Sequence, residues 1–267
     1  MNPSTDNAPV ERAALEKFVP GPGNGKQIVM WLYLFVLLGL TSVAVWAAVA
    51  VFRLLLPLET AWDYAEAILA ATLVFHFAYL AALLGLRLII PYCPEGFYPI
   101  TADGRLPKEI VIFMFNILLT KARYEPPWMH FLGGMLANIH PLRLPYRRYF
   151  GPHTVSDNFG DLTRFLDPYL VHAGRNVQFG FFTVVICHLF DNRGLRIERV
   201  VIEDHATIGG ESLLMPGVRI GHHALVAARS LVKAGTQIGP YEYWGGIPAK
   251  FIKKLEPAEA AAAEPAA

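Results

Sequence analysis

Two long apolar stretches dominate the first third of the chain. Residues 28–52 contain no charged side chain over 25 positions, and residues 67–86 contain none over 20 positions. A helix of 25 residues is roughly 37 Å long, which is enough to cross a hydrocarbon core of about 30 Å. We therefore predict two transmembrane helices within residues 27–90. Two buried helices of a soluble domain are the alternative.

Basic side chains flank these stretches, and acidic ones gather between them. The connecting loop holds Glu59, Asp63 and Glu66. The flanking basic residues are Arg12, Lys17, Lys26, Arg87, Arg105 and Lys108. The positive-inside rule then predicts a multi-pass protein of the inner (cytoplasmic) membrane, with both termini and the C-terminal part in the cytoplasm. His76 lies in the middle of the second span, where an ionisable group is a functional candidate. A neutral histidine that is hydrogen-bonded to the neighbouring helix is the plainer interpretation.

Residues 91–165 mix short apolar runs with basic groups. Residues 110–119 are apolar but too short to span a bilayer, and basic side chains follow them. Helices in the membrane interface and helices packed on the catalytic domain both fit this pattern. Residues 1–26 and 256–267 are predicted to be disordered tails.

A period of six residues governs the chain from Val200 onward. Aliphatic side chains occupy seven successive positions, Ile202, Ile208, Leu214, Ile220, Val226, Val232 and Ile238, and smaller side chains lie two positions before each. An amphipathic helix needs a period of 3.6, and no hairpin turn signals interrupt the run. The pattern predicts a parallel β-helix, in which each aliphatic side chain points inward onto its counterpart in the next coil.

The repeat is interrupted upstream of Val200. A weaker match at Val171, Val177 and Thr183 stands 19 residues from Ile202, and 19 is not a multiple of six. This break predicts a loop that leaves the β-helix, and loops on rigid scaffolds often carry chemistry. Only three or four coils are expected, so self-association would cover the exposed faces.

Composition narrows the class of protein. Charged residues make up 17% of the chain, against about 25% in soluble domains, which favours membrane segments. The net charge of +1 gives no indication of nucleic-acid binding. Two cysteines far apart in sequence give no disulfide framework.

The run from Val200 to Gly239, closed by Gly245-Gly246-Ile247-Pro248-Ala249-Lys250, resembles the hexapeptide-repeat acetyltransferases of the galactoside, maltose and virginiamycin type. The resemblance covers residues 166–255 and leaves out the two predicted spans. It implies a left-handed parallel β-helix, a homotrimer with active sites between subunits, and acetyl-CoA or another short acyl-CoA as co-substrate without a metal. The implied acceptor is a hydroxyl or amine. The position of the spans favours a saccharide or a membrane-associated molecule.

In such enzymes the catalytic histidine precedes the regular coils, and here that position is His188, which also lies inside the break in the repeat. An imidazole can remove the proton of an attacking hydroxyl and return it to the departing thiolate. Asp191 and Asn192 are candidates for orienting the acceptor or the histidine. A surface-loop histidine is the alternative interpretation of His188.

Contacts to the donor carry over from the same resemblance. Gly209, Gly210, Ala227 and Ala228 match positions at which small residues of the family let the pantetheine arm approach the backbone. Backbone N–H groups at Gly209-Gly210 are candidate oxyanion donors. Lys233 lies where the family has a Thr-Lys pair, but Ala234 follows it here. Lys250 is the basic residue of the closing motif, and Lys253 and Lys254 would add to it or form a solvated tail.

Two other functions compete with this interpretation. A zinc enzyme of the γ-carbonic-anhydrase type would draw on histidines, of which His188, His205, His222 and His223 are available. His205 and His223 are 18 residues apart, so they are expected to stack on adjacent coils as a surface ladder. A non-catalytic membrane scaffold is the third possibility.

Overall fold

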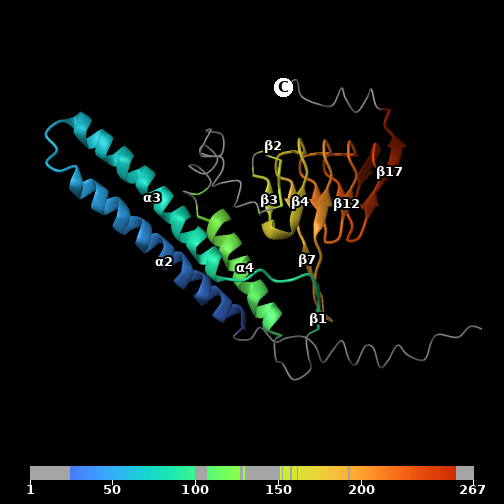
Figure 1. The fold of residues 1–267 in the computed structure, drawn as a ribbon, viewed down its shortest axis with the longest axis horizontal. Coiled ribbons are helices and arrows are strands. Elements are labelled where there is room, and N and C mark those ends of the chain that lie inside the picture. The colour runs from blue at the N-terminus through green and yellow to red at the C-terminus, as the bar shows by residue number, and fades with distance from the viewer. Residues whose placement is uncertain are drawn as a thin grey trace, which may run out of the picture.

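A helical hairpin and a β-helix make up the chain (Figure 1). This computed structural model describes residues 25–99, 107–126, 129, 151, 153–156, 158–160, 162–191 and 193–256. Helix α2 (Gly25–Leu54) and helix α3 (Ala61–Ile89) pack against each other through Leu40, Ala44 and Leu83. Both predicted tails, apart from a few residues at their inner ends, and much of residues 91–165 lie outside the described ranges.

Most of the hairpin surface is apolar and uncovered. Residues Met30–Leu54 and Ala61–Ile89 are long and apolar enough to cross a membrane. In the most apolar 18-residue stretch of each helix, only 11% and 28% is buried. Phe35, Leu38 and Trp46 are among the exposed side chains. A capping box begins α3, because Thr60 accepts from the Asp63 N–H and Asp63 accepts from the Thr60 N–H. His76 is fully buried, and neither ring nitrogen has a hydrogen-bond partner in the described part of the chain, which contradicts the expected bond to a neighbouring helix.

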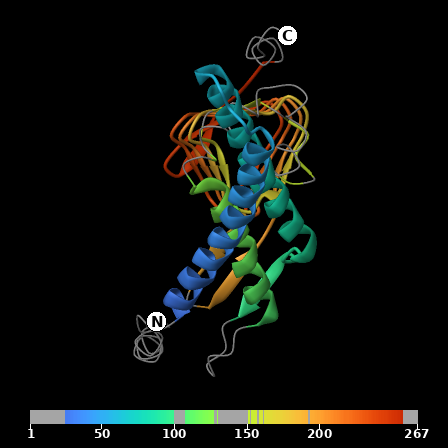
Figure 2. The same ribbon diagram turned by 90° about the vertical axis from the view of Figure 1, so that its left-hand side faces the viewer.

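Helix α4 (Lys108–Tyr124) joins the two parts of the molecule. Its Ile110 and Phe113 enter the core of the β-helix, whereas Leu119 and Ala122 enter the core of the hairpin. Figure 2 shows the three helices standing in front of one end of the coils. The described part of this segment therefore packs on both the β-helix and the hairpin, and its place in the membrane interface stays a prediction.

Three parallel sheets form the walls of the β-helix. The first contains β2 (Asn158–Phe159), β5 (Gln178–Phe179), β10 (Thr207–Ile208), β13 (Leu225–Val226) and β16 (Glu242–Gly246). The second contains β3 (Arg164–Phe165), β6 (Val184–Val185), β11 (Leu213–Leu214) and β14 (Leu231–Val232). The third contains β4 (Val171–Ala173), β9 (Val200–Ile202), β12 (Arg219–Ile220) and β15 (Gln237–Ile238). The described strands make four coils and the first wall of a fifth.

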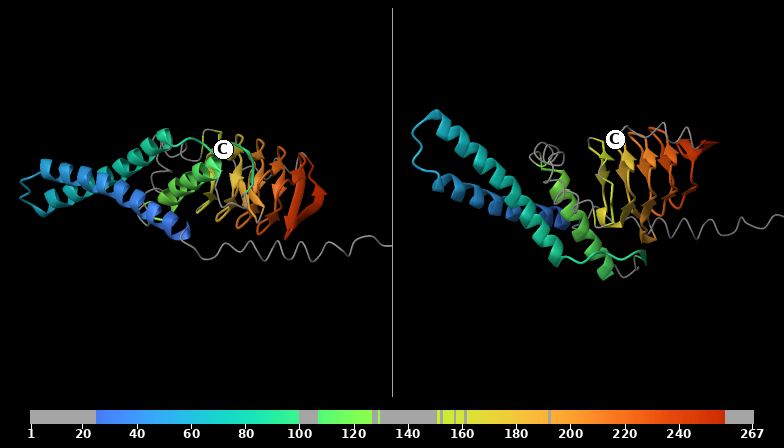
Figure 3. Two further views of the ribbon diagram at one scale, coloured as in Figure 1. Left: turned by 90° about the horizontal axis from the view of Figure 1, so that it is seen from below. Right: turned by 45° about the horizontal axis from the view of Figure 1, so that its top comes forward.

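The ends of this short solenoid are covered by the chain itself. Helix α4 covers the first coil. At the other end, β17 (Ala249–Lys254) folds back antiparallel on β16, and Trp244 and Ala249 pack on the core (Figure 3). Parallel pairing already starts at Thr154, which bridges to Ala173, so the β-helix extends upstream of the predicted boundary at residue 166.

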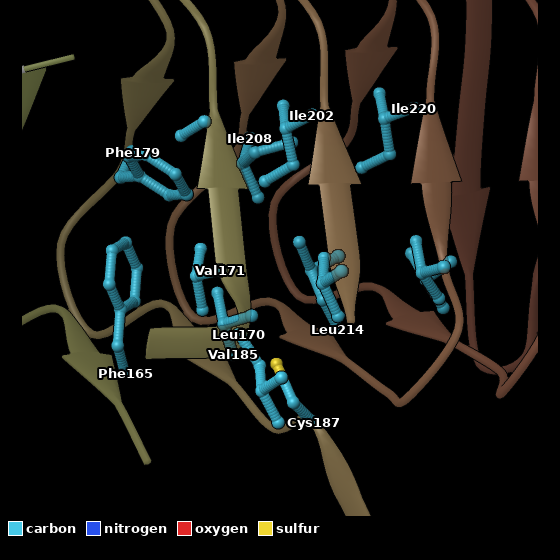
Figure 4. Close-up of a cluster of buried hydrophobic side chains, with 14 of the residues drawn as sticks. Phe165, Leu170, Val171, Phe179, Val185, Cys187, Ile202, Ile208, Leu214 and Ile220 are labelled. Atoms are coloured by element: carbon cyan, nitrogen blue, oxygen red, sulfur yellow. The ribbon is translucent and has the colours of Figure 1, made fainter. Parts of the chain in front are cut away.

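The core confirms the six-residue pattern. All seven aliphatic positions from Ile202 to Ile238 are at most 4% exposed, and Figure 4 shows Ile202 and Ile220 in one row and Leu214 in a second row inside the coils. Upstream, the inward positions are aromatic: Phe165 and Phe179 pack edge to face with centroids 5.1 Å apart. The aliphatic period is weaker there because larger rings fill the first coils.

One consequence concerns stability. Leu214 is fully buried in β11, whereas the adjacent Leu213 is only half-buried on the opposite face of the strand. We expect Leu214→Ala to lower the free energy of unfolding by about 2–5 kcal/mol, because a cavity opens between coils. Leu213→Ala is the matched control, with a markedly smaller expected loss. Denaturant titration of both variants checks this, and equal losses would contradict the assigned register.

Candidate active site

The break in the repeat is a β-hairpin that projects from the coils. It consists of β7 (His188–Phe190) and β8 (Gly194–Ile197), and β1 (Gly96–Pro99) adds a third antiparallel strand (Figure 1). Residues that pair between neighbouring strands are 29 positions apart in sequence where the hairpin intervenes, as for Val184 and Leu213. In the later coils the paired residues are 18 positions apart, as for Leu213 and Leu231. The predicted excursion from the β-helix is therefore confirmed.

The hairpin is tied to the end of the second long helix. Strand β1 follows α3 after six residues, and its whole length pairs with β8. Glu95 accepts hydrogen bonds from the Arg199 backbone N–H at 2.9 Å and from its guanidinium Nε at 2.6 Å. These contacts hold β7, and with it His188, at a fixed place between the coils and the helices.

A carboxylate holds the His188 side chain. The His188 Nδ1 lies 2.7 Å from Asp167 Oδ2, and the same oxygen accepts from the Cys187 N–H at 3.0 Å. Since an ionised carboxylate only accepts, the tautomer of the neutral imidazole that fits this contact has its proton on Nδ1 and a lone pair on Nε2. Asp167 is 1% exposed, and its Oδ1 has no hydrogen-bond partner in the described part of the chain. An imidazole held in this way can serve as an oriented general base.

Strand register brings these two residues together. Arg164 and Phe165 of β3 pair with Val184 and Val185 of β6, so continuing the register places Asp167 opposite Cys187. Asp167 and Cys187 are 20 residues apart, not 18, and the first coils have aromatic instead of aliphatic core residues. The six-residue period is therefore hidden there, and the sequence interpretation missed Asp167. An aspartate directly before the Pro168-Tyr169 turn is the only local signal.

His188 is partly accessible and its neighbour Cys187 is not. The His188 side chain is 20% exposed, and its ring meets the edge of Phe113 from α4 at a centroid distance of 4.7 Å. Cys187 is fully buried, and burial, together with the charge of Asp167, raises the pKa of its thiol well above the usual value. A thiol that stays protonated is a poor nucleophile, which favours direct transfer over an acyl-cysteine.

The other residues predicted on this loop have different surroundings. The Asp191 carboxylate closes the β7–β8 turn, where it accepts from the backbone N–H groups of Arg193 at 2.8 Å and Gly194 at 3.2 Å. It is therefore Asp167, and not Asp191, that orients His188. A role of Asp191 in acceptor binding stays a prediction, and Asn192 lies outside the described residues.

The small residues predicted to accept the donor stack at one corner. Gly209-Gly210 follows β10 and Ala227-Ala228 follows β13, on adjacent coils. A Cβ on Gly209 would lie 2.3 Å from the Ala228 nitrogen, so only glycine fits there. The Gly209 N–H donates to the Val226 carbonyl at 2.8 Å and is not available as an oxyanion donor. Lys250 joins this corner, because it pairs with Gly245 on the next coil.

A single chain does not bring this corner to His188. The turns after β5, β10 and β13 stack at one end of the second sheet, whereas His188 follows β6 and lies at the other end. Lys233 follows β14 and is therefore on the His188 side, two coils or roughly 10 Å further along the axis. Lys253 and Lys254 lie in β17 and are exposed.

His205 and His223 form the ladder that their spacing predicts. His205 and His223 stack with centroids 4.8 Å apart, and Tyr241 continues the stack at 4.9 Å from His223. Among the described residues, no group of three His, Cys, Asp or Glu side chains is placed to hold a metal ion.

No protein-family model matches the sequence, and no curated protein matches it significantly. Solved structures resemble part of the chain. The acetyltransferase VCA0836 of Vibrio cholerae O1 biovar eltor, complexed with acetyl-CoA, is 22% identical over 51% of this chain and 92% of its own, with a TM-score of 0.38. A maltose O-acetyltransferase of Clostridium difficile 630 is 22% identical over 47% and 83%, with a TM-score of 0.35.

AntD of Bacillus cereus, an N-acyltransferase in complex with dTDP and 3-hydroxybutyryl-CoA, is 20% identical over 37% of this chain, with a TM-score of 0.33. The match spans 59% of AntD, which is less than two thirds of its length. Because these likenesses are partial and distant, the function is inferred from the geometry of this chain.

Proposed function

We propose that this chain is a membrane-anchored acyltransferase that uses acetyl-CoA or another short acyl-CoA, with O-acetyl transfer as the simplest reaction. The observation that carries the proposal is the Asp167–His188 pair, in which the buried Asp167 carboxylate orients the His188 ring. The acceptor is a saccharide or a membrane-associated molecule with a hydroxyl or amine.

The proposed reaction needs one base and no covalent enzyme intermediate. The His188 Nε2 takes the proton of the acceptor hydroxyl while its oxygen bonds to the thioester carbonyl carbon. The tetrahedral intermediate collapses, the carbon–sulfur bond breaks, and the imidazolium returns the proton to the thiolate. Asp167 stabilises the imidazolium during this cycle and keeps Nε2 directed at the substrates. The products are the acyl ester and free coenzyme A.

A homotrimer, or another assembly of copies, is part of the proposal. His188 and the corner formed by Gly209, Gly210, Ala227, Ala228 and Lys250 lie at opposite ends of one sheet of the same chain. A neighbouring copy that presents its corner to His188 would complete the donor groove. The left-handed sense of the coils belongs to the same proposal.

Membrane anchoring rests on the uncovered apolar surface of α2 and α3. The β-helix connects to the ends of the hairpin opposite the 55–60 loop (Figure 1). If the hairpin spans a bilayer, the coils and both ends of the hairpin share one side, which the positive-inside rule makes the cytoplasm.

The test uses the purified full chain with acetyl-CoA and a membrane or glycan extract. We expect release of free coenzyme A in step with an acetyl-sized mass gain on one acceptor. Release of coenzyme A without any acetylated product would contradict group transfer. The scaffold alternative predicts neither signal.

A further inference from the structure

A pocket lies where the helical hairpin meets the first coil. Its walls come from the last turns of α3, the middle of α4 and the 3-10 turn η1 (Pro168–Leu170). Carbon surfaces come from Leu84, Leu119 and Pro168, and polar groups come from Arg87 and Tyr169. This mixed lining suits a ligand with both apolar and polar parts.

A stack of side chains fixes the polar wall. The Arg87 guanidinium lies 3.9 Å from the centroid of the Tyr92 ring, and the Tyr92 ring stacks on Tyr169 at 4.7 Å. Asn116 Oδ1 accepts from the Arg87 guanidinium, while the Asn116 amide donates to the carbonyls of Pro91 at 3.1 Å and Ile112 at 2.8 Å. The positive charge and the phenol are thus held in place before any ligand arrives.

The Tyr169 hydroxyl has no acceptor among the described residues. Tyr169 is 7% exposed, and its hydroxyl has no hydrogen-bond partner in the part of the chain that the structure describes. Burial raises the pKa of Tyr169 above its usual value, with a smaller contribution from Asp167, so the group remains an O–H donor. A buried donor without an acceptor costs free energy, which a ligand oxygen would recover.

The pocket lies at the end of the second candidate span. Arg87 is in the last turn of α3, and Leu88 and Ile89 beyond it are 89% and 77% exposed. In a bilayer this level is the boundary between acyl chains and headgroups, where basic side chains meet lipid phosphates.

We propose that this pocket binds the phosphate of an anionic phospholipid, with Tyr169 donating to a phosphate oxygen, Arg87 supplying positive charge, and Leu84 and Leu119 contacting the adjoining glycerol and acyl carbons. The site rests on the proposed placement of α3 in a bilayer and does not depend on the acyl transfer reaction.

Native mass spectrometry of the full chain in detergent tests the site. Phosphatidylglycerol, phosphatidylcholine and inorganic phosphate are titrated separately. Tyr169→Phe removes only the hydroxyl, and we expect it to bind phosphatidylglycerol about tenfold more weakly, since a hydrogen bond to a charged group is lost. Tyr98→Phe is the matched control, because that phenol donates to the Pro94 carbonyl at 2.8 Å, outside the pocket.

The wild-type chain and Tyr98→Phe are expected to prefer phosphatidylglycerol to phosphatidylcholine. Without lipid, Tyr169→Phe should melt at or above the wild-type temperature, because no hydrogen bond is lost in the empty site. Equal phosphatidylglycerol affinity in wild type and Tyr169→Phe would overturn the proposal. Equal binding of both lipids, or inorganic phosphate binding as tightly as phosphatidylglycerol, would overturn the assignment to an anionic lipid.

Discussion

Replacing His188 with alanine is expected to lower kcat by about 10²–10⁴-fold, the usual contribution of a general base. The residual rate would come from binding alone. His188 sits on a projecting hairpin and is 20% exposed, so its removal leaves the buried core of the coils intact. The measurement is coenzyme A release at saturating donor, with circular dichroism to confirm folding.

His222→Ala is the control for this substitution. His222 meets the rings of the His205–His223–Tyr241 stack edge to face and is half-buried at another corner of the coils. Its loss is expected to leave the rate nearly unchanged. A His188→Ala variant that folds and turns over like the wild type would contradict the assigned base.

Asp167→Asn is expected to lower kcat by about 10²–10⁴-fold, as for loss of the base itself, while the KM for acetyl-CoA stays close to wild type. The amide can donate to Nδ1 and so favour the tautomer whose Nε2 carries the proton, which cannot act as a base. The substitution also removes the charge that would stabilise the imidazolium. Steady-state kinetics with varied acetyl-CoA separates kcat from KM.

If Asp167 had a purely structural role, its substitution would lower the folded fraction but not the kcat of the folded enzyme. Asp167 also accepts from the Cys187 N–H, so a loss of stability would lower the active fraction of every preparation. The folded fraction of each preparation, measured by circular dichroism, corrects kcat for that loss. Asp204→Asn, which breaks an exposed pair with Arg175, is the matched control with unchanged kcat. If the corrected kcat of Asp167→Asn equals that of wild type, Asp167 does not position the base.

The β-helix could be predicted from sequence because its restraint is local and repeated. Each coil buries one aliphatic residue per wall, so Ile208, Leu214 and Ile220 occur at a constant spacing whatever lies elsewhere in the chain. The projecting loop was predicted for the same reason, since eleven extra residues break a strict period. His188 came from the resemblance to the hexapeptide-repeat acetyltransferases, and its place in that break agreed with it.

Asp167 and β1 could not be predicted in this way. Asp167 reaches His188 through the pairing of β3 with β6, in coils whose aromatic core and 20-residue spacing hide the period. Strand β1 pairs with β8 across about 100 residues, and a four-residue segment holds no information about so distant a partner. The burial of His76 is a third case: its ring has no hydrogen-bond partner among the described residues, and no local pattern encodes the tertiary packing that buries it.

A structure of the purified protein with coenzyme A bound tests the central claim most directly. We expect the thiol of the cofactor beside His188 Nε2, in a groove whose other wall is the Gly209–Ala228 corner of a second copy. A thiol bound far from His188, or a cofactor groove enclosed by one chain at a different corner, would contradict the proposed chemistry.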